Sequence, residues 1–79
     1  MSITSDTFGR RLLYARTRRD LAAVQLAKRT GIHVTQISHF ESDRREPSAG
    51  NIRKLALALD ITADYLLGLS TETRRIIET

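Results

Sequence analysis

The fold of this chain is decided by residues 23–40, AVQLAKRTGIHVTQISHF. Apolar positions recur at helical spacing on both sides of Gly31, a residue that tolerates the positive φ of a tight turn. Two helices joined by such a turn cross closely, at roughly 90–120°. The small side chain of Ala27 would let the two helices approach, and Ile37 would fill the angle between them. This stretch therefore predicts a helix-turn-helix.

Helical periodicity continues on both sides of this stretch, and no sustained strand-type alternation is present. We expect Thr4 or Ser5 to cap the first helix, Ser48 the fourth and Thr62 the fifth. The sequence thus predicts an all-α fold, with a compact five-helix domain over residues 6–69, a flexible N-terminus over 1–5 and a short helical tail over 70–79. The five helices are expected over about 6–19, 22–30, 33 or 34 to 41, 49–59 and 63–69.

Basic side chains are concentrated in the first two thirds of the chain. The 79 residues carry 13 basic and 9 acidic side chains, and the formal net charge is +4. Residues 1–54 hold eleven basic and five acidic side chains, whereas residues 55–79 hold two and four. This distribution suits a protein that meets a polyanion on one side, but charge alone is equally typical of a solvated surface.

Several function classes find no support in the sequence. The absence of cysteine excludes disulfides and thiolate zinc sites, and no carboxylate pair joins His33 and His39 in a metal site. Ser38, His39 and Asp43 fall on one short helix and its loop, so they do not predict a catalytic triad. The longest apolar run has five residues, too few for a membrane span. We expect a cytoplasmic protein that is not an enzyme and needs no cofactor.

Residues 8–69 resemble the Cro/C1-type helix-turn-helix family, the five-helix DNA-binding domain of phage repressors and many small bacterial regulators. The resemblance implies a lambda-repressor-like bundle that binds double-stranded DNA. It also implies a structural ion pair between Arg16, late in the first helix, and Glu41, at the end of the recognition helix. The positions that match the family pattern are Arg16, Leu26, Ala27, Gly31, Ile37, Glu41, Pro47, Ser48, Leu59, Tyr65, Leu66 and Leu67.

The same resemblance assigns the DNA contacts. The outer side of the recognition helix would reach base edges in the major groove, where methyl groups can meet thymine and polar atoms can hydrogen-bond. The loop after it and the start of the next helix would meet phosphates. The base contacts expected are Val34, Thr35, Gln36, Ser38 and His39, and the phosphate contacts expected are Arg44, Arg45 and Asn51.

Two features depart from the family pattern. Ala22 and Ala23 stand where the family usually begins its second helix with Ser or Thr followed by Gln, so we expect Asp20 to supply the missing cap. Asp43 stands where glycine is usual after the glutamate. Aspartate tolerates the left-handed conformation, but this position would bring a negative charge near the DNA surface.

The predicted function is that of a sequence-specific transcriptional regulator, of the phage-repressor or restriction–modification-controller type, which binds a pseudo-palindromic operator as a homodimer. Two alternatives stay open. One is an antitoxin, whose main partner would be a toxin, and the other is a protein–protein module that has lost DNA binding; an antirepressor would be a further protein partner. The dimer contact is expected at Leu66, Leu69, Ile76 and Ile77.

Overall fold

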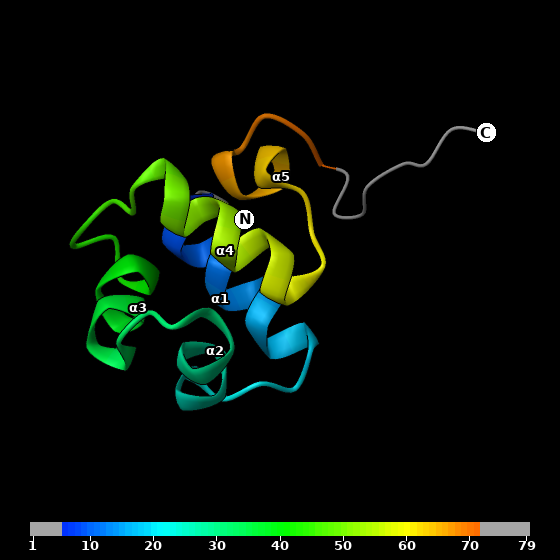
Figure 1. Ribbon diagram of the computed structural model, residues 1–79. Coiled ribbons are helices and arrows are strands. Elements are labelled where there is room, and N and C mark those ends of the chain that lie inside the picture. Colours follow the sequence, from blue (N-terminus) through cyan, green and yellow to red (C-terminus); the bar gives the residue numbers. More distant parts are fainter. Residues whose placement is uncertain (1–5, 72–79) are drawn as a thin grey trace.

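The computed structural model of the chain describes residues 6–71, which form five helices and no strand (Figure 1). The predicted all-α, five-helix architecture is confirmed. The helices are α1 (Phe8–Arg18), α2 (Ala23–Thr30), α3 (Val34–Glu41), α4 (Ala49–Leu59) and α5 (Ala63–Leu67).

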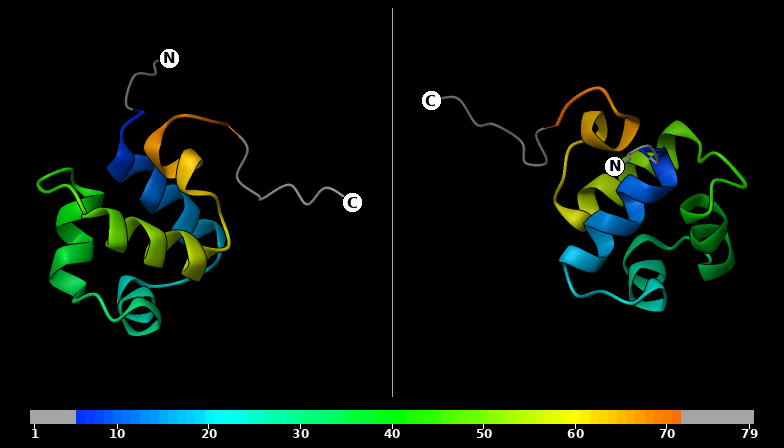
Figure 2. Two further views of the ribbon diagram at one scale, coloured as in Figure 1. Left: turned by 45° about the horizontal axis from the view of Figure 1, so that its top comes forward. Right: turned by 180° about the vertical axis from the view of Figure 1, so that it is seen from behind.

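Helices α1 and α4 lie alongside each other in the middle of the molecule, with α2 and α3 at one end and α5 at the other (Figures 1 and 2). Helix α1 packs against α3 and α5, and α4 packs against α2 and α5. Every helix contributes at least one side chain to the core. The fully buried side chains are Leu12, Leu26, Ile37, Leu55, Leu59 and Leu66.

Side-chain caps define the starts of four helices. Ser48 and Thr62 cap α4 and α5 as predicted, because their hydroxyl oxygens accept from the backbone N–H groups of Asn51 and Tyr65. The expectation of Thr4 or Ser5 as the cap of α1 is wrong. Thr7 caps it instead, because the helix begins only at Phe8, its first inward-facing residue.

Helices α2 and α3 begin in ways that the sequence did not reveal. His33 caps α3, since its Nδ1 accepts from the Thr35 N–H at 3.1 Å. Asp20 does not cap α2, because it lies in the preceding turn with φ 55°. The Gln25 side chain instead accepts from the Ala22 N–H at 2.7 Å and satisfies one backbone donor at this end.

Two predicted segments, the flexible residues 1–5 and most of the helical tail over 70–79, lie outside the described residues. Within residues 6–71, no helix has the length and apolar character needed to cross a membrane.

Candidate nucleic-acid interface

Helices α2 and α3 are joined by the tight turn that Gly31 was expected to make. Gly31 has φ 77° and ψ 6°, and its N–H donates to the Ala27 carbonyl at 2.8 Å. A Cβ atom at this position would meet nothing within 4 Å, so the turn needs glycine for its backbone angle and not for space. Ile37 is completely buried in the angle between the two helices.

The outer face of α3 carries the side chains predicted to read DNA bases. Thr35, Gln36 and Ser38 are exposed, and Val34 and His39 are half-buried at its edges. Thr35 and His39 are four residues apart and therefore share one side of the helix. No hydrogen bond among the described residues engages the side chains of this face.

A neighbouring apolar residue was missed by sequence reasoning. Val24 on α2 is 53% exposed and lines a shallow pocket together with Val34. The only indication of this exposure in the sequence was that Val24 follows Ala23, which points inward, so that Val24 falls on the solvent side of α2.

The predicted phosphate contacts lie just beyond α3. Arg44 and Arg45 are exposed in the loop between α3 and α4, and within residues 6–71 neither makes an ion pair. The Arg44 N–H donates to the His39 carbonyl at 2.9 Å, which holds the start of this loop against the end of α3. Asn51 is half-buried in the first turn of α4.

Arg16 and Glu41 form a two-pronged ion pair between α1 and α3. Arg16 Nε lies 2.6 Å from Glu41 Oε2 and Nη2 lies 3.1 Å from Oε1, while Nη1 donates to the Leu21 carbonyl at 2.7 Å. The two side chains are only 14% and 12% exposed. The hydrogen bond to Glu41 raises the pKa of Arg16. The stability that this raised pKa of Arg16 contributes is therefore fully present at neutral pH and is lost as the pH rises through the pKa of Arg16.

Gly9 brings the start of α1 into direct contact with the end of α3. A Cβ atom on Gly9 would lie 2.4 Å from the Glu41 carbonyl oxygen and 2.6 Å from that of Phe40. Both atoms belong to the backbone, so neither can move aside like a flexible side chain. Only glycine permits this separation of the two helices.

The Asp43 carboxylate has partners at the start of α1 that the sequence did not reveal. Its carboxylate accepts from the Gly9 N–H at 2.9 Å and from the Thr7 hydroxyl at 2.6 Å, so it is bonded to the N-terminal end of α1. This end carries the positive pole of the helix dipole, which favours an acidic partner. Asp43 also adopts the left-handed conformation, with φ 61°, that usually favours glycine.

We name Gly9, Arg16, Glu41 and Asp43 together the α1–α3 junction. Both acidic residues at the end of α3 are directed to partners on α1, whereas the two arginines that follow are free of ion pairs within the described part of the chain. Sequence reasoning missed Gly9 and the hydrogen-bond partners of Asp43, because more than thirty residues separate them.

Replacing Asp43 with alanine should destabilise the domain by about 1–2 kcal/mol, because two hydrogen bonds at the start of α1 are lost. Asp20→Ala is the matched control: Asp20 also has a positive φ, but its side chain makes no hydrogen bond in residues 6–71. Thermal unfolding followed by circular dichroism measures both variants. Equal losses of stability would show that only the backbone conformation matters at Asp43.

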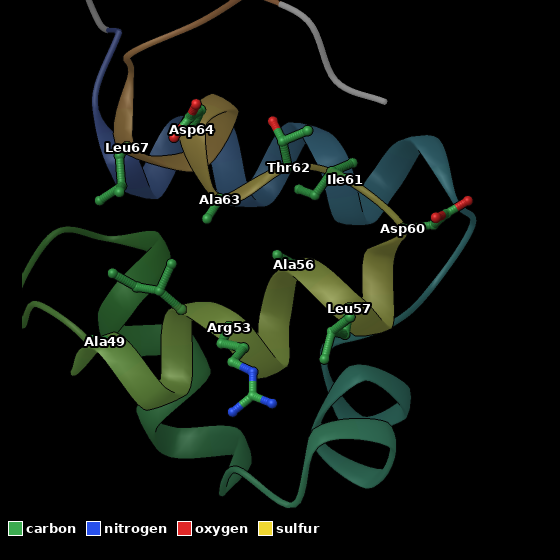
Figure 3. A pocket seen from close by; sticks show the side chains of 11 residues that line it. Ala49, Arg53, Ala56, Leu57, Asp60, Ile61, Thr62, Ala63, Asp64 and Leu67 are labelled. Carbon is green, nitrogen blue, oxygen red and sulfur yellow. The ribbon is translucent and has the colours of Figure 1, made fainter. Parts of the chain in front are cut away.

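The expected dimer contact is only partly compatible with the structure. Leu66 is completely buried in the core, so its assignment to a dimer interface is wrong. The helical spacing of α5 did not reveal which of its leucines turn inward. Leu69 is 73% exposed, and Ile76 and Ile77 lie outside the described residues. Leu57 on α4 and Leu67 on α5, 63% and 46% exposed, are further exposed apolar residues and line a groove between these two helices (Figure 3).

Comparison with known proteins places the chain among helix-turn-helix domains. The family model described as helix-turn-helix matches residues 12–66. The transcriptional regulator ImmR of Bacillus subtilis (strain 168) is 31% identical over 62 residues. That alignment covers 78% of this chain and 49% of ImmR, so the chain spans about half the length of the curated relative it matches.

Solved structures agree with this assignment. The P22 c2 repressor in complex with a synthetic operator superposes with a TM-score of 0.79 and 29% identity, covering 84% of this chain and 100% of that one. The solution structure of the P22 c2 DNA-binding domain gives a TM-score of 0.77 and 29% identity, covering 90% and 96%.

The restriction–modification controller protein C.AhdI from Aeromonas hydrophila gives a TM-score of 0.73 and 38% identity, covering 76% of this chain and 91% of that one. Because the family model matches well over half of its residues, the chain belongs to the Cro/C1-type helix-turn-helix family of DNA-binding transcriptional regulators, which are not enzymes.

Proposed function

We propose that this protein represses transcription by binding a pseudo-palindromic operator sequence as a homodimer. The observation that carries the proposal is the composition of the α3 surface. Within residues 6–71, the side chains of its outer face make no hydrogen bonds, and the two exposed arginines that follow it make no ion pairs. The P22 c2 repressor, which shares this fold, is a repressor that binds an operator.

In this proposal α3 enters the major groove. The methyl groups of Val34 and Thr35 contact thymine methyls, and the Thr35 hydroxyl and His39 hydrogen-bond base edges. Gln36 and Ser38 reach either a base or a phosphate. Arg44, Arg45 and Asn51 contact phosphates and thereby fix the register of α3 on the duplex.

One copy of α3 reads only a half-site. Two half-sites about one helical turn apart, roughly 34 Å, require two copies related by a twofold axis. We propose that the dimer contact is formed by exposed Leu69 and by the apolar pair Ile76 and Ile77. Leu57 and Leu67 are added to this set, and Leu66 is left out because it is buried.

The test is fluorescence anisotropy with labelled DNA taken from upstream of the gene that encodes this chain, compared with scrambled DNA of the same composition. Tight binding that weakens with salt and prefers the upstream sequence is the expected result. The absence of binding to either DNA at low salt would refute the proposal, because the exposed arginines should give at least non-specific attraction.

Replacing Thr35 with alanine should lower the preference for the operator over scrambled DNA by about 1 kcal/mol or more, because one base contact is lost. Thr17→Ala on α1 is the control, since Thr17 is also exposed in a helix but lies away from α3. Anisotropy with both DNAs gives the ratio of affinities. If the two variants retain the same preference, Thr35 does not read a base.

Replacing Arg44 and Arg45 together with alanine should weaken binding to all DNA sequences alike. The slope of log affinity against log salt should decrease by about 0.9 for each lost phosphate contact. The control exchanges Arg18 and Lys28, which are exposed on α1 and α2. A slope unchanged from that of the original protein would show that the loop arginines do not touch phosphate.

A further inference from the structure

The turn that joins α2 to α3 (Figure 1) ends at His33, and this residue supplies acceptors for three backbone N–H groups of α3. Its carbonyl oxygen accepts from Gln36 at 3.0 Å and from Ile37 at 3.1 Å, and its ring atom Nδ1 accepts from Thr35 at 3.1 Å. The N–H groups in the first turn of a helix find few partners within the helix itself. His33 therefore holds the first turn of α3 in place.

This first turn carries Val34 and Thr35, whose methyl groups are proposed to contact thymine. Each of these side chains reaches a base edge only if the backbone beneath it is fixed, because hydrogen bonds weaken steeply as their geometry departs from the optimum. His33 thus influences both side chains through the backbone that follows it.

The other side of the turn is held by groups that do not titrate near neutral pH. The Thr30 hydroxyl donates to the Leu26 carbonyl at 2.9 Å and accepts from the Ile32 N–H at 3.1 Å. Histidine is the side chain that ordinarily changes charge between pH 5 and pH 8. Among the side-chain hydrogen bonds that the structure describes for residues 30–35, only the bond to His33 therefore depends on pH in this range.

Protonation of the His33 ring abolishes its bond to Thr35. Nδ1 can accept this N–H only in the neutral imidazole, because both ring nitrogens are donors once the ring is protonated. The ring would then also place a positive charge at the positive pole of the α3 dipole. Protonation therefore removes the cap and adds repulsion at the same end of the helix.

The charged groups around His33 offer a protonated ring no acidic partner. Lys28, exposed on α2, lines the same shallow pocket as His33, and the first turn of α3 contains no acidic residue. Glu41, at the other end of α3, is bonded to Arg16 on α1. His39 lies nearly two turns further along α3. Within residues 6–71, His33 takes part in no ion pair.

We infer that His33 is a positioning residue for sequence reading, and that α3 prefers its operator only while the His33 imidazole is neutral. The inference rests on the proposed reading of bases by α3. When His33 gains a proton, the preference for the operator over scrambled DNA should fall about fivefold, as expected from the loss of one helix cap. Attraction to phosphates does not fall, because an added positive charge favours binding to any DNA.

Three proteins test the role of the ring as an acceptor: the original chain, His33→Ser and His33→Ala. Serine caps a helix without titrating in this range, whereas alanine provides no cap. The operator is a duplex that the original protein enriches from a randomised pool at about pH 8, and its scrambled version is the reference. Fluorescence anisotropy at about pH 8 and about pH 5.5, at one ionic strength, gives the ratio of the two affinities.

The expected pattern differs among the three proteins. His33→Ser keeps its preference at both pH values, His33→Ala has the reduced preference at both, and the original protein changes from the first behaviour to the second as the pH falls. A decline in His33→Ser as large as that of the original protein would overturn the inference. Full preference of His33→Ala at both pH values would overturn it as well.

His39 requires its own control, because it also titrates and is a proposed base contact. His39→Gln removes this titration and leaves the cap of α3 unchanged. The decline at low pH should persist in His39→Gln. If it disappears there and remains in His33→Ser, His39 carries the pH dependence and the inference fails.

A measurement without DNA tests the hydrogen bond itself. In two-dimensional proton–nitrogen NMR spectra of the free protein, the Thr35 amide signal should move as the His33 ring titrates and should stay in place in His33→Ser. A Thr35 signal that does not respond to this titration would overturn the proposed role of the ring.

Failure of the proposed function gives a different result. If the randomised pool yields no enriched duplex at about pH 8, the protein has no sequence preference, and the proposed function and this inference are overturned together. If a preference exists but is the same at both pH values, the inference alone is overturned and operator binding stands.

Discussion

Substitution of Gly9 with alanine is expected to destabilise the domain by about 3 kcal/mol or more, although only one methyl group is added. The new Cβ atom would lie 2.4 Å from the backbone oxygen of Glu41. Relief of this overlap requires α1 to move away from α3, which also stretches the hydrogen bond between the Gly9 N–H and Asp43. A domain of this size should lose roughly 10–20 °C in melting temperature.

Gly50→Ala is the matched control for this substitution. Gly50 lies in the first turn of α4, where the nearest atom to a new Cβ is Ser48 Oγ at 3.8 Å, an ordinary contact. Because alanine favours the helix, this variant should gain up to about 1 kcal/mol. Thermal unfolding followed at 222 nm compares the two. A Gly9→Ala variant that melts within a few degrees of the original protein would contradict the close approach of α1 and α3.

Substitution of Glu41 with alanine is expected to cost about 3 kcal/mol, because it leaves the Arg16 guanidinium without its charged partner in a largely enclosed site. The solvent that still reaches both side chains keeps this effect at the lower end of the range for buried pairs. Chemical denaturation with urea gives the free energy of unfolding directly.

Glu46→Ala is the control, since Glu46 is exposed and makes no ion pair within residues 6–71; its effect should stay within about 0.5 kcal/mol. The double variant with Arg16→Met and Glu41→Leu should recover part of the loss, because no isolated charge remains. Equal stability of Glu41→Ala and Glu46→Ala would mean that the ion pair contributes nothing measurable.

Much of the fold could be predicted from local signals. The apolar spacing around Gly31 located α2 and α3 to within one or two residues, because each depends on neighbours in the sequence. Ser48 and Thr62 were identified as caps for the same reason. Thr7 was missed because four consecutive residues that can cap a helix, 4–7, precede Phe8, and the packing of Phe8 decides which one is used.

The candidate site was less predictable wherever it depends on contacts between distant segments. The α3 side chains were predicted as base contacts from their positions on one helix. The Arg16–Glu41 ion pair was predicted from the family resemblance. No pattern in the sequence indicated that Asp43 bonds to Thr7 and Gly9. Leu66 was misassigned because α5 is too short for its spacing to separate inner from outer leucines.

The separation between the α1–α3 junction and the outer face of α3 has a consequence for how such proteins diversify. The residues that orient α3 lie at its end and on α1, while Thr35, Gln36 and Ser38 bear no structural hydrogen bonds through their side chains in the described part of the chain. Mutations at these three positions should therefore cost little stability. Descendants of this gene could acquire new target sequences one substitution at a time while the scaffold stays unchanged.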